Sequence, residues 1–402
     1  MPPDPLPLIA RETSLGRLPR DADLYSLVAA PGGRWACAVR RVDKVVCVVD
    51  GRASAEYDGI GQGSPAFSPD GRRCACVVRR GREVRILADG AEGPAWDGVL
   101  AGGLCFDLAG RLAYWALRDG RAHLVVDGAP GPAYDPGLGF GRIAFGPAGT
   151  PIAWVITRGE KTFVVVDGAE DPETDGVGAA SPMISPDGRV GYTAWRGEKQ
   201  VVVIAGVESR EWDAVAAGMP VLGPAGRWAY GARLGERWFF VGDGFELATD
   251  PVIDLAFSPN GATLARAVRT AGGIRVSIGD EVGPEVEALG RGLVFSPDSR
   301  RLAYAAVRGG RDLVVVDGVA GPEYDGVGEG GPVFSPDGRH VAFTAWREGK
   351  PLLVVDGREA GPWDLLPRGS HPTFDGPGAL HFTALRGEEV LRVDVRIEGP
   401  FL

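Results

Sequence analysis

The sequence predicts an all-β protein: a β-propeller of four-stranded antiparallel blades, with ten blades in one ring. Two observations lead to this prediction. A turn of the form Ser-Pro-Asp-Gly recurs along the chain, intact at residues 68–71, 185–188 and 335–338, and its spacing stays between 35 and 40 residues. Such a period indicates stacked supersecondary units. The second position of the turn, intact or altered, falls at Pro31, Pro69, Leu108, Pro147, Pro186, Pro224, Pro259, Pro297, Pro336 and Gly376.

Each repeat contains four expected strands, as the ninth unit illustrates. An extended run over 332–335 ends in the turn 336–338, where proline presets φ, aspartate bonds its own backbone and glycine accepts a positive φ. Further strands follow over 340–346, 352–355 and 361–364. Four short strands joined by tight turns make one antiparallel meander.

The third strand of the repeat indicates that both faces of each sheet are covered. Residues 164–166, 314–316 and 352–355 are unbroken runs of valine and leucine. A sheet with one wet face would alternate apolar and polar residues, so these runs favour sheets stacked on both sides, as in a propeller. A β-solenoid has shorter repeats, and the density of glycine and proline excludes helical repeats.

The unit count leaves one alternative, two five-bladed rings with a seam near residues 205–225, where the repeat diverges. The interval across that region is still 38 residues, which leaves no room for a linker and favours a single ring. We expect an N-terminal segment over residues 1–21 that closes the ring or covers the channel, and a ten-unit propeller over 22–402. The competing source of the closing strand is residues 398–401, because an open sheet edge invites aggregation.

Charged residues recur at fixed places in the repeat. Every unit has an arginine near the end of its second strand: Arg40, Arg79, Arg118, Arg158, Arg196, Arg233, Arg269, Arg308, Arg347 and Arg386. Eight outer strands end in aspartate: Asp58, Asp97, Asp135, Asp175, Asp213, Asp250, Asp325 and Asp364. Because both strand ends lie on one side of a blade, we expect a structural girdle of charge pairs there. The Asp-Gly turns lack the clustered carboxylates of calcium loops and are expected to be tight turns: Asp50, Asp127, Asp167, Asp317 and Asp356.

One run of residues also indicates a family. Residues 334–343, Phe-Ser-Pro-Asp-Gly-Arg-His-Val-Ala-Phe, resemble the WD-repeat-like, PD-type units of TolB-like propellers. The resemblance covers residues 22–395 and recurs in nearly every unit. The outer half of each unit departs from that family, with Val-Val-Asp-Gly followed by Gly-Pro-x-Tyr/Trp-Asp. The resemblance implies binding or scaffolding roles, or a propeller fused to an enzyme.

Composition argues against several classes of protein. The net charge of −10 does not suit sequence-independent binding of nucleic acid, and no apolar run is long enough to span a bilayer. The first twenty residues lack the apolar core of a signal peptide. Five cysteines lack the spacing of a disulfide framework: Cys37, Cys47, Cys74, Cys76 and Cys105. We therefore expect a bacterial, cytoplasmic monomer without a nucleic-acid or membrane partner.

Motifs for catalysis, cofactors or metals are absent from the sequence. The four histidines share no metal-ligand spacing, and no Gly-x-Ser-x-Gly elbow occurs. The glycine-rich stretch 326–331 is not followed by a predicted helix, as a phosphate-binding loop would be. We predict no catalytic, cofactor-binding or metal-binding residue. The least repeat-like polar feature is the loop that contains Arg368 and His371, and these two are the predicted binding residues.

The sequence thus predicts a non-catalytic binding or scaffolding propeller for a protein, a peptide or another extended ligand. Contacts are expected at the channel mouth, where repeated loops suit a multivalent ligand. An enzyme of hydrolase or lyase type with its site in the channel is one alternative, and an exported TolB-like accessory protein is another. The connections expected at the mouth lie near residues 59–65, 136–142, 176–182, 326–332 and 365–372.

Overall fold

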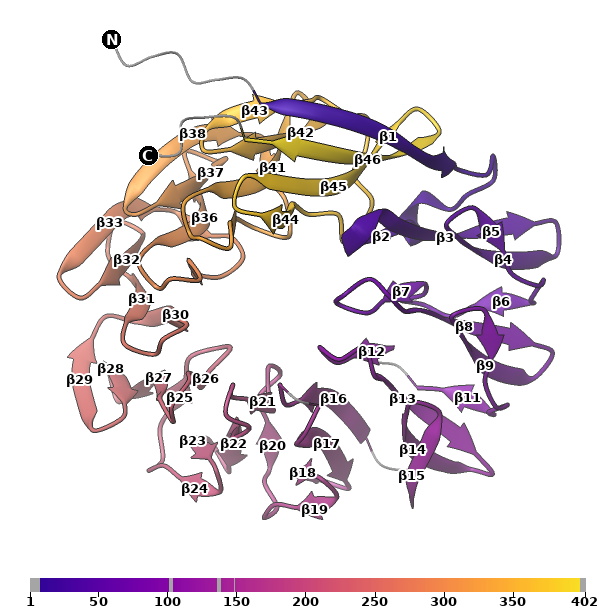
Figure 1. Cartoon of the computed structure of the whole chain (residues 1–402). Helices are drawn as coiled ribbons and strands as arrows, with labels where there is room; N and C mark the ends of the chain where they lie inside the picture. Colours follow the sequence, from indigo (N-terminus) through magenta and orange to yellow (C-terminus); the bar gives the residue numbers. More distant parts are fainter. Residues whose placement is uncertain (1–7, 101–103, 136–138, 148, 398–402) are drawn as a thin grey trace, which may run out of the picture. The chain divides into compact units, whose positions relative to one another are not determined.

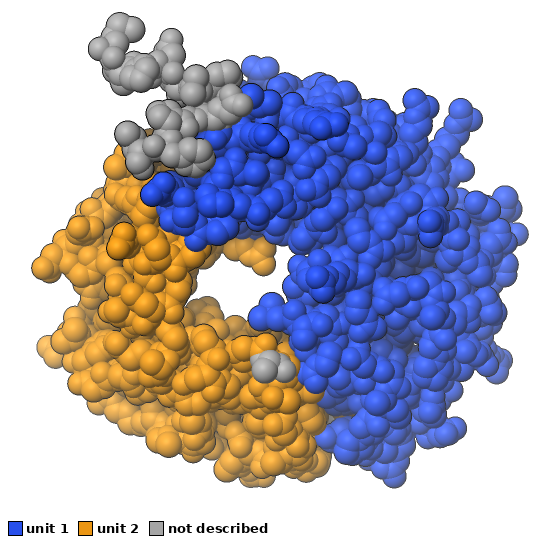
Figure 2. Space-filling view, viewed as in Figure 1, with its two compact units in different colours: residues 1–136, 324–402 blue, residues 137–323 orange. Residues whose placement is uncertain are grey.

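The fold is all-β, a ten-bladed β-propeller, as the sequence predicts (Figure 1). The structure is a computed structural model that describes residues 8–100, 104–135, 139–147 and 149–397. Its strands form ten antiparallel four-stranded sheets, numbered as blades 1–10 in chain order. Two short 3-10 turns, η1 (Leu24–Ser26) and η2 (Pro31–Gly33), flank the first strand of blade 1. The chain divides into two compact units, residues 1–136 with 324–402, and residues 137–323 (Figure 2).

The first unit contains blades 1, 2, 3, 9 and 10. Blades 1 and 2 consist of β2 (Val28–Ala30), β3 (Arg34–Arg41), β4 (Lys44–Val49) and β5 (Arg52–Ala53), then β6 (Gly59–Ile60), β7 (Ala66–Phe67), β8 (Cys74–Arg80), β9 (Glu83–Ala88) and β10 (Ala91–Glu92). Blade 3 consists of β11 (Gly98–Val99), β12 (Cys105–Phe106), β13 (Leu112–Arg118), β14 (Arg121–Val126) and β15 (Ala129–Tyr134). Blades 9 and 10 consist of β39 (Gly326–Val327), β40 (Val333–Phe334), β41 (Val341–Arg347), β42 (Lys350–Val355) and β43 (Arg358–Ala360), then β44 (Thr373–Gly376), β45 (Ala379–Arg386), β46 (Glu389–Arg396) and β1 (Ile9–Arg17).

The second unit contains blades 4 to 8. Blades 4 and 5 consist of β16 (Gly139–Phe145), β17 (Ile152–Arg158), β18 (Lys161–Val166) and β19 (Ala169–Glu170), then β20 (Gly176–Val177), β21 (Met183–Ile184), β22 (Val190–Arg196), β23 (Lys199–Ile204) and β24 (Val207–Glu208). Blade 6 consists of β25 (Ala214–Val215), β26 (Val221–Leu222), β27 (Trp228–Leu234), β28 (Arg237–Gly242) and β29 (Phe245–Thr249). Blades 7 and 8 consist of β30 (Val252–Phe257), β31 (Leu264–Arg269), β32 (Ile274–Ile278) and β33 (Glu281–Val286), then β34 (Ala288–Leu289), β35 (Val294–Phe295), β36 (Leu302–Arg308), β37 (Arg311–Val316) and β38 (Val319–Tyr324).

Tight turns hold each blade together, as the Asp-Gly and Ser-Pro-Asp-Gly patterns predict. Asp50 and Gly51 both have positive φ, 50° and 78°, the signature of a type I′ hairpin turn. The Asp50 carboxylate also accepts a hydrogen bond from the backbone N–H of Trp35 (2.9 Å). In the Ser-Pro-Asp-Gly turn, the buried hydroxyl of Ser335 donates to Asp337 (2.6 Å) and accepts from the N–H of His340 (2.9 Å). Serine therefore has a structural role of its own in the turn.

The first strand of six blades is broken into two short pieces, and in blades 2 and 5 a buried serine bridges the break. In blade 2, both β6 and β7 pair with β8. Between them, the Ser64 hydroxyl accepts a hydrogen bond from the N–H of Val77 (2.9 Å), and Ser181 does the same for Thr193 (3.1 Å) in blade 5. An unpaired buried N–H costs about 1–3 kcal/mol, so each of these two serines stabilises its blade.

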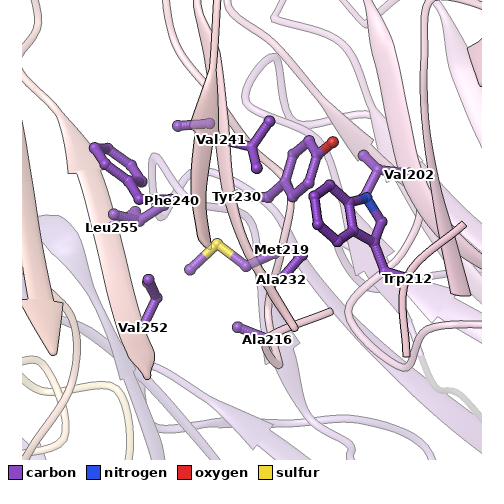
Figure 3. Close-up of a cluster of buried hydrophobic side chains, with 11 residues drawn as sticks. Val202, Trp212, Ala216, Met219, Tyr230, Ala232, Phe240, Val241, Val252 and Leu255 are labelled. Carbon is purple, nitrogen blue, oxygen red and sulfur yellow. The ribbon is translucent and has the colours of Figure 1, made fainter. Parts of the chain in front are cut away.

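Apolar side chains cover both faces of the blades. The central residues of the third strands are buried in succession, as at 46–48 in β4 and 201–203 in β23. Figure 3 shows one such core, in which Trp212 meets Tyr230 edge-on at 6.2 Å between ring centroids. Val202 of blade 5, Tyr230 of blade 6 and Leu255 of blade 7 belong to this one cluster, so the blades are packed without a seam at residues 205–225.

The last blade is completed by the N-terminal strand, and it lies beside the first blade. Strand β1 pairs with β46 from Ile9 opposite Arg396 to Arg17 opposite Glu389. The N–H of Ala29 in blade 1 donates to the carbonyl of Arg368, just before blade 10 (2.8 Å). Together with the continuous packing across residues 205–225, these contacts contradict two separate five-bladed propellers. Residues 398–401, the other closing candidate, lie outside the described residues.

A recurring contact ties neighbouring blades together, and β1 supplies it for the last blade. The Tyr57 hydroxyl of blade 1 donates to the carboxylate of Glu92 in blade 2 (2.7 Å). In blade 9, the indole N–H of Trp363 donates to Glu12 of β1 (2.9 Å), and Arg386 donates to the same carboxylate (2.6 Å). Glu12 therefore has the same role in blade 10 that Glu92 has in blade 2.

The ion pairs at the hairpin ends differ from the expected arginine–aspartate girdle. Second-strand arginines pair with fourth-strand glutamates: Arg158–Glu170, Arg196–Glu208, Arg308–Glu323, Arg347–Glu359 and Arg386–Glu12. All four lysines of the chain pair with outer-strand aspartates: Lys44–Asp58, Lys161–Asp175, Lys199–Asp213 and Lys350–Asp364. The aspartates face lysines because the third strand is the direct neighbour of the fourth. The antiparallel bridge between Thr162 and Thr174 sets Lys161 opposite Asp175.

Candidate functional site

Two hollows lie between blades 1 and 2 of the first unit. One, of about 600 Å³, opens beside the β3–β4 hairpin, and we call it the hairpin groove. The other, of about 870 Å³, is lined by β4, β8 and the outer strands, and we call it the outer hollow. The hairpin groove is lined by Asp23, Tyr25, Ser26, Ala38, Arg40, Val42, Asp43, Lys44, Val45, residues 58–64 and Arg368.

The turn η1 places Tyr25 at the groove. The Asp23 carboxylate accepts a hydrogen bond from the N–H of Tyr25 (3.0 Å), which caps the turn. The hydroxyl of Ser26 donates to the Asp23 carbonyl (2.7 Å) and accepts from the N–H of Ala38 in β3 (2.7 Å). These bonds hold the turn on blade 1 and leave the Tyr25 side chain 95% exposed.

Val42 is held in an unfavourable backbone conformation at the tip of the β3–β4 hairpin. Its φ is +38°, and its side chain is 97% exposed. A β-branched residue at positive φ is an outlier that costs about 1–2 kcal/mol. At the same place in the hairpin, Asp119 and Glu348 have positive φ but are not β-branched. Six other blades have glycine there: Gly81, Gly159, Gly197, Gly235, Gly309 and Gly387. Residues with a strained backbone cluster at functional sites.

The charges of the groove are only partly paired. Lys44 lies 2.5 Å from the Asp58 carboxylate, which also accepts from the N–H of Gly81. The Gly81 N–H and Lys44 together lower the pKa of Asp58. Arg40 and Arg368 are exposed and form no ion pair with a described residue. Two guanidinium groups are therefore available to a ligand.

The two predicted binding residues lie in different surroundings. Arg368 is bridged to β2 through its backbone and lines the hairpin groove. His371 binds the carbonyl of Gly369 through Nδ1 (2.9 Å) and packs against Gly330, where an added Cβ would lie 2.8 Å from the His371 Cβ. It lines a separate small hollow with Ala30 and His381. The structure thus brings Arg368, and not His371, to the groove.

The sequence reasoning missed Tyr25 and Val42. Val42 had a usable signal, since it replaces the glycine that recurs at the hairpin tip. Of the connections predicted at the channel mouth, residues 59–64 line the groove, whereas 136–138 lie outside the described residues.

The turn at residues 107–109, where Leu108 stands in place of the repeated proline, departs from the repeat for a structural reason. The buried carboxylate of Asp107 accepts from the backbone N–H and the side chain of Arg111, both at 2.7 Å, in place of the usual serine.

The outer hollow is bounded by a contact between blades. Burial raises the pKa of Tyr57 to about 12, so its hydroxyl remains protonated and donates to Glu92. The Arg80 guanidinium lies 5.1 Å from the centre of the Tyr57 ring, a cation–π distance. Three cysteines, Cys47, Cys74 and Cys76, also line this hollow.

The described residues contain no group of three or more His, Cys, Asp or Glu side chains placed to hold a metal ion. In the same part of the chain, no helix is long and apolar enough to cross a membrane. The lining of the hairpin groove combines two exposed side chains, Tyr25 and Val42, with two arginines that form no ion pair with a described residue. Aromatic and arginine side chains are enriched at protein interfaces.

Comparison with known proteins assigns neither a family nor a function to this chain. No family model and no curated protein match this sequence. The chain is similar to a crystal structure of a eukaryotic initiation factor, with 13% identity over 89% of this chain and 90% of that one, at a TM-score of 0.44. It is also similar to TolB from Acinetobacter baumannii (14% identity over 65% and 63% of the chains, TM-score 0.31). The Dos1 propeller is similar over 98% and 96% of the chains (10% identity, TM-score 0.37). At these values, the ten-bladed fold rests on the strand pairings themselves.

Proposed function

We propose that this protein is a non-catalytic binding propeller that holds an extended segment of a partner protein in the hairpin groove. The observation that carries the proposal is Val42, an exposed β-branched residue at positive φ where six other blades have glycine. Among the residues that the structure describes, no contact of the side chain compensates this backbone strain, because the side chain is 97% exposed. Contact with a partner would bury the side chain and offset the strain.

The groove suggests the chemistry of the bound segment. Tyrosine and arginine are the side chains enriched at the energetic centres of protein interfaces, and Tyr25, Arg40 and Arg368 line one groove. Guanidinium groups match carboxylates in a planar, bidentate geometry. We therefore propose that the segment carries an apolar side chain that contacts Tyr25 and Val42, and an aspartate or glutamate that reaches the arginines.

Peptide selection on the full-length protein tests this proposal. A random peptide library panned on the immobilised protein should yield peptides with an apolar residue near an acidic one. Val42→Ala and Tyr25→Ala should each weaken binding of the selected peptide about tenfold, which corresponds to about 1.4 kcal/mol. Val207→Ala removes another exposed valine, in β24, and should leave the affinity unchanged. The proposal fails if no such peptide is selected, or if both groove variants bind it as tightly as the wild type.

Several broader properties belong to the same proposal. The Ser-Pro-Asp-Gly turns support a repeat of the PD type, as in TolB-like propellers. Five free cysteines fit a reducing compartment, and we propose that the protein is bacterial and cytoplasmic. The acidic composition supports a protein partner over nucleic acid. Cell fractionation tests the compartment, and light scattering tests the expected monomeric state.

A further inference from the structure

Two cysteines from neighbouring blades meet in the core between blades 1 and 2. Cys47 lies on β4 and Cys76 on β8, both are buried, and their sulfur atoms are 2.6 Å apart. They are 29 residues apart in the sequence. A third buried thiol, Cys74, lies two residues before Cys76 on the same strand. Peptide binding in the hairpin groove does not involve these three thiols.

The outer hollow exists where blade 2 departs from the repeat. Cys76 occupies the third position of its strand, where other blades have an aromatic residue: Tyr114, Tyr192, Tyr230, Tyr304 and Phe343. A thiol is much smaller than an aromatic ring, so the replacement leaves space between the blades. All three cysteines line this hollow of about 870 Å³, which has the size of a small-molecule pocket. A small oxidant therefore has a route to the sulfur atoms.

We propose that Cys47 and Cys76 form a reversible disulfide bond that links blade 1 to blade 2, with the outer hollow as the entry for a small-molecule disulfide. Glutathione disulfide is an oxidant of this class. One cysteine, as thiolate, attacks the oxidant and releases one glutathione thiol, which leaves a mixed disulfide. The second cysteine attacks the protein sulfur of that mixed disulfide and releases the second glutathione. Two protein S–H bonds are lost and one S–S bond is formed, while two electrons and two protons pass to the glutathione thiols.

The surroundings of the pair make the reduced form persistent. Hydrogen bonds with Cys47 and Cys74, together with burial, raise the pKa of Cys76 far above its usual range. The attacking species is the thiolate, so oxidation through Cys76 is slow. The bond therefore forms when the oxidant is abundant, and the protein retains free thiols otherwise.

Peptide mapping of the native, full-length protein tests the bond. The protein is incubated with glutathione disulfide, its remaining thiols are alkylated, and it is digested with trypsin without reduction. The expected product joins peptides 45–52 and 74–79, and it is lighter than the two free peptides by two hydrogen atoms. Because Cys74 and Cys76 share a peptide, variants identify the partner. Cys74→Ser and the control Cys105→Ser should retain the product, whereas Cys76→Ser and Cys47→Ser should lose it.

Two further readouts keep the test decisive if a variant folds poorly. Dithiothreitol should restore both free peptides, and the oxidised wild type should unfold at a higher urea concentration than the reduced form. The proposal is overturned if native wild-type protein gives no linked peptide, if it gives only glutathione adducts, or if the product persists in Cys76→Ser.

Discussion

A substitution at the hairpin tip of blade 1 measures how much the strained backbone of the candidate groove lowers the free energy of unfolding. Val42→Gly should stabilise the protein, because glycine adopts positive φ without steric cost whereas a β-branched residue costs about 1–2 kcal/mol. The side chain is 97% exposed, so its removal forfeits almost no packing. The greater freedom of glycine in the unfolded chain offsets about 0.5–1 kcal/mol. The expected net gain in the free energy of unfolding is about 0.5–1 kcal/mol.

The matched control is the reverse change in the neighbouring blade. Gly81 has φ +61° at the same place in the hairpin, and a Cβ added there would meet nothing within 4 Å. Gly81→Val therefore introduces the backbone strain alone and should destabilise the protein by about 1 kcal/mol. Urea unfolding measures both changes as shifts of the midpoint at constant slope. The reasoning is refuted if Val42→Gly lowers the midpoint, or if Gly81→Val leaves it unchanged.

Three further changes test how the blades are held. Glu12→Gln should lower the free energy of unfolding at neutral pH by about 1 kcal/mol, since it weakens charge-assisted bonds to β1. Arg386 lowers the pKa of Glu12, so the wild type keeps this advantage above the unfolded-state pKa and loses it as the pH falls through the folded-state pKa. The urea midpoints of wild type and variant should converge in acid, and a constant difference would contradict the ion pair. Ser64→Ala should lower the free energy of unfolding by about 1–3 kcal/mol and speed hydrogen exchange at the Val77 amide. An amide that stays protected in the variant would contradict this role of the serine. Asp107→Ala should cost about 1–3 kcal/mol, because it removes the buried acceptor of the Arg111 backbone N–H in the turn. Asp107→Ser restores the usual turn residue and should lower the melting temperature less than Asp107→Ala does. Equal losses of melting temperature would exclude the turn explanation.

The blades, the turns and the covered faces were predictable because each depends on local pattern. Glycine and aspartate at positive φ, and unbroken apolar third strands, are visible in the sequence of a single repeat. The charge pairs were not predicted correctly, because they depend on which strands are neighbours and on the register between them. Lys161 faces Asp175 across adjacent strands, a neighbourhood that only the register defines. For the same reason, the sequence left open whether the N-terminal strand completes the last blade.

The candidate groove was harder to find, because the prediction gave weight to a polar loop and not to a departure from the repeat. Of Arg368 and His371, only the arginine lines the groove, and the loop offers no signal that separates them. Val42 stands out only when the hairpins are aligned, since a valine by itself carries no chemistry. Its importance comes from backbone geometry, and a sequence shows that geometry only through the glycines at equivalent positions.

The two proposals concern the same pair of blades and therefore constrain each other. The hairpin groove takes its walls from blade 1 and from residues 58–64 that lead into blade 2, and the thiols of Cys47 and Cys76 bridge those two blades. A disulfide that fixes the blades in the geometry that binds the peptide would raise the affinity of the groove. By thermodynamic reciprocity, the peptide would then favour the disulfide by the same factor. Two measurements give this factor. One compares the affinity of the selected peptide for oxidised and reduced protein, and the other compares the thiol–disulfide equilibrium constant with and without peptide. If the two factors are equal and differ from one, the thiol pair regulates peptide binding. If both factors equal one, the disulfide only links the two blades.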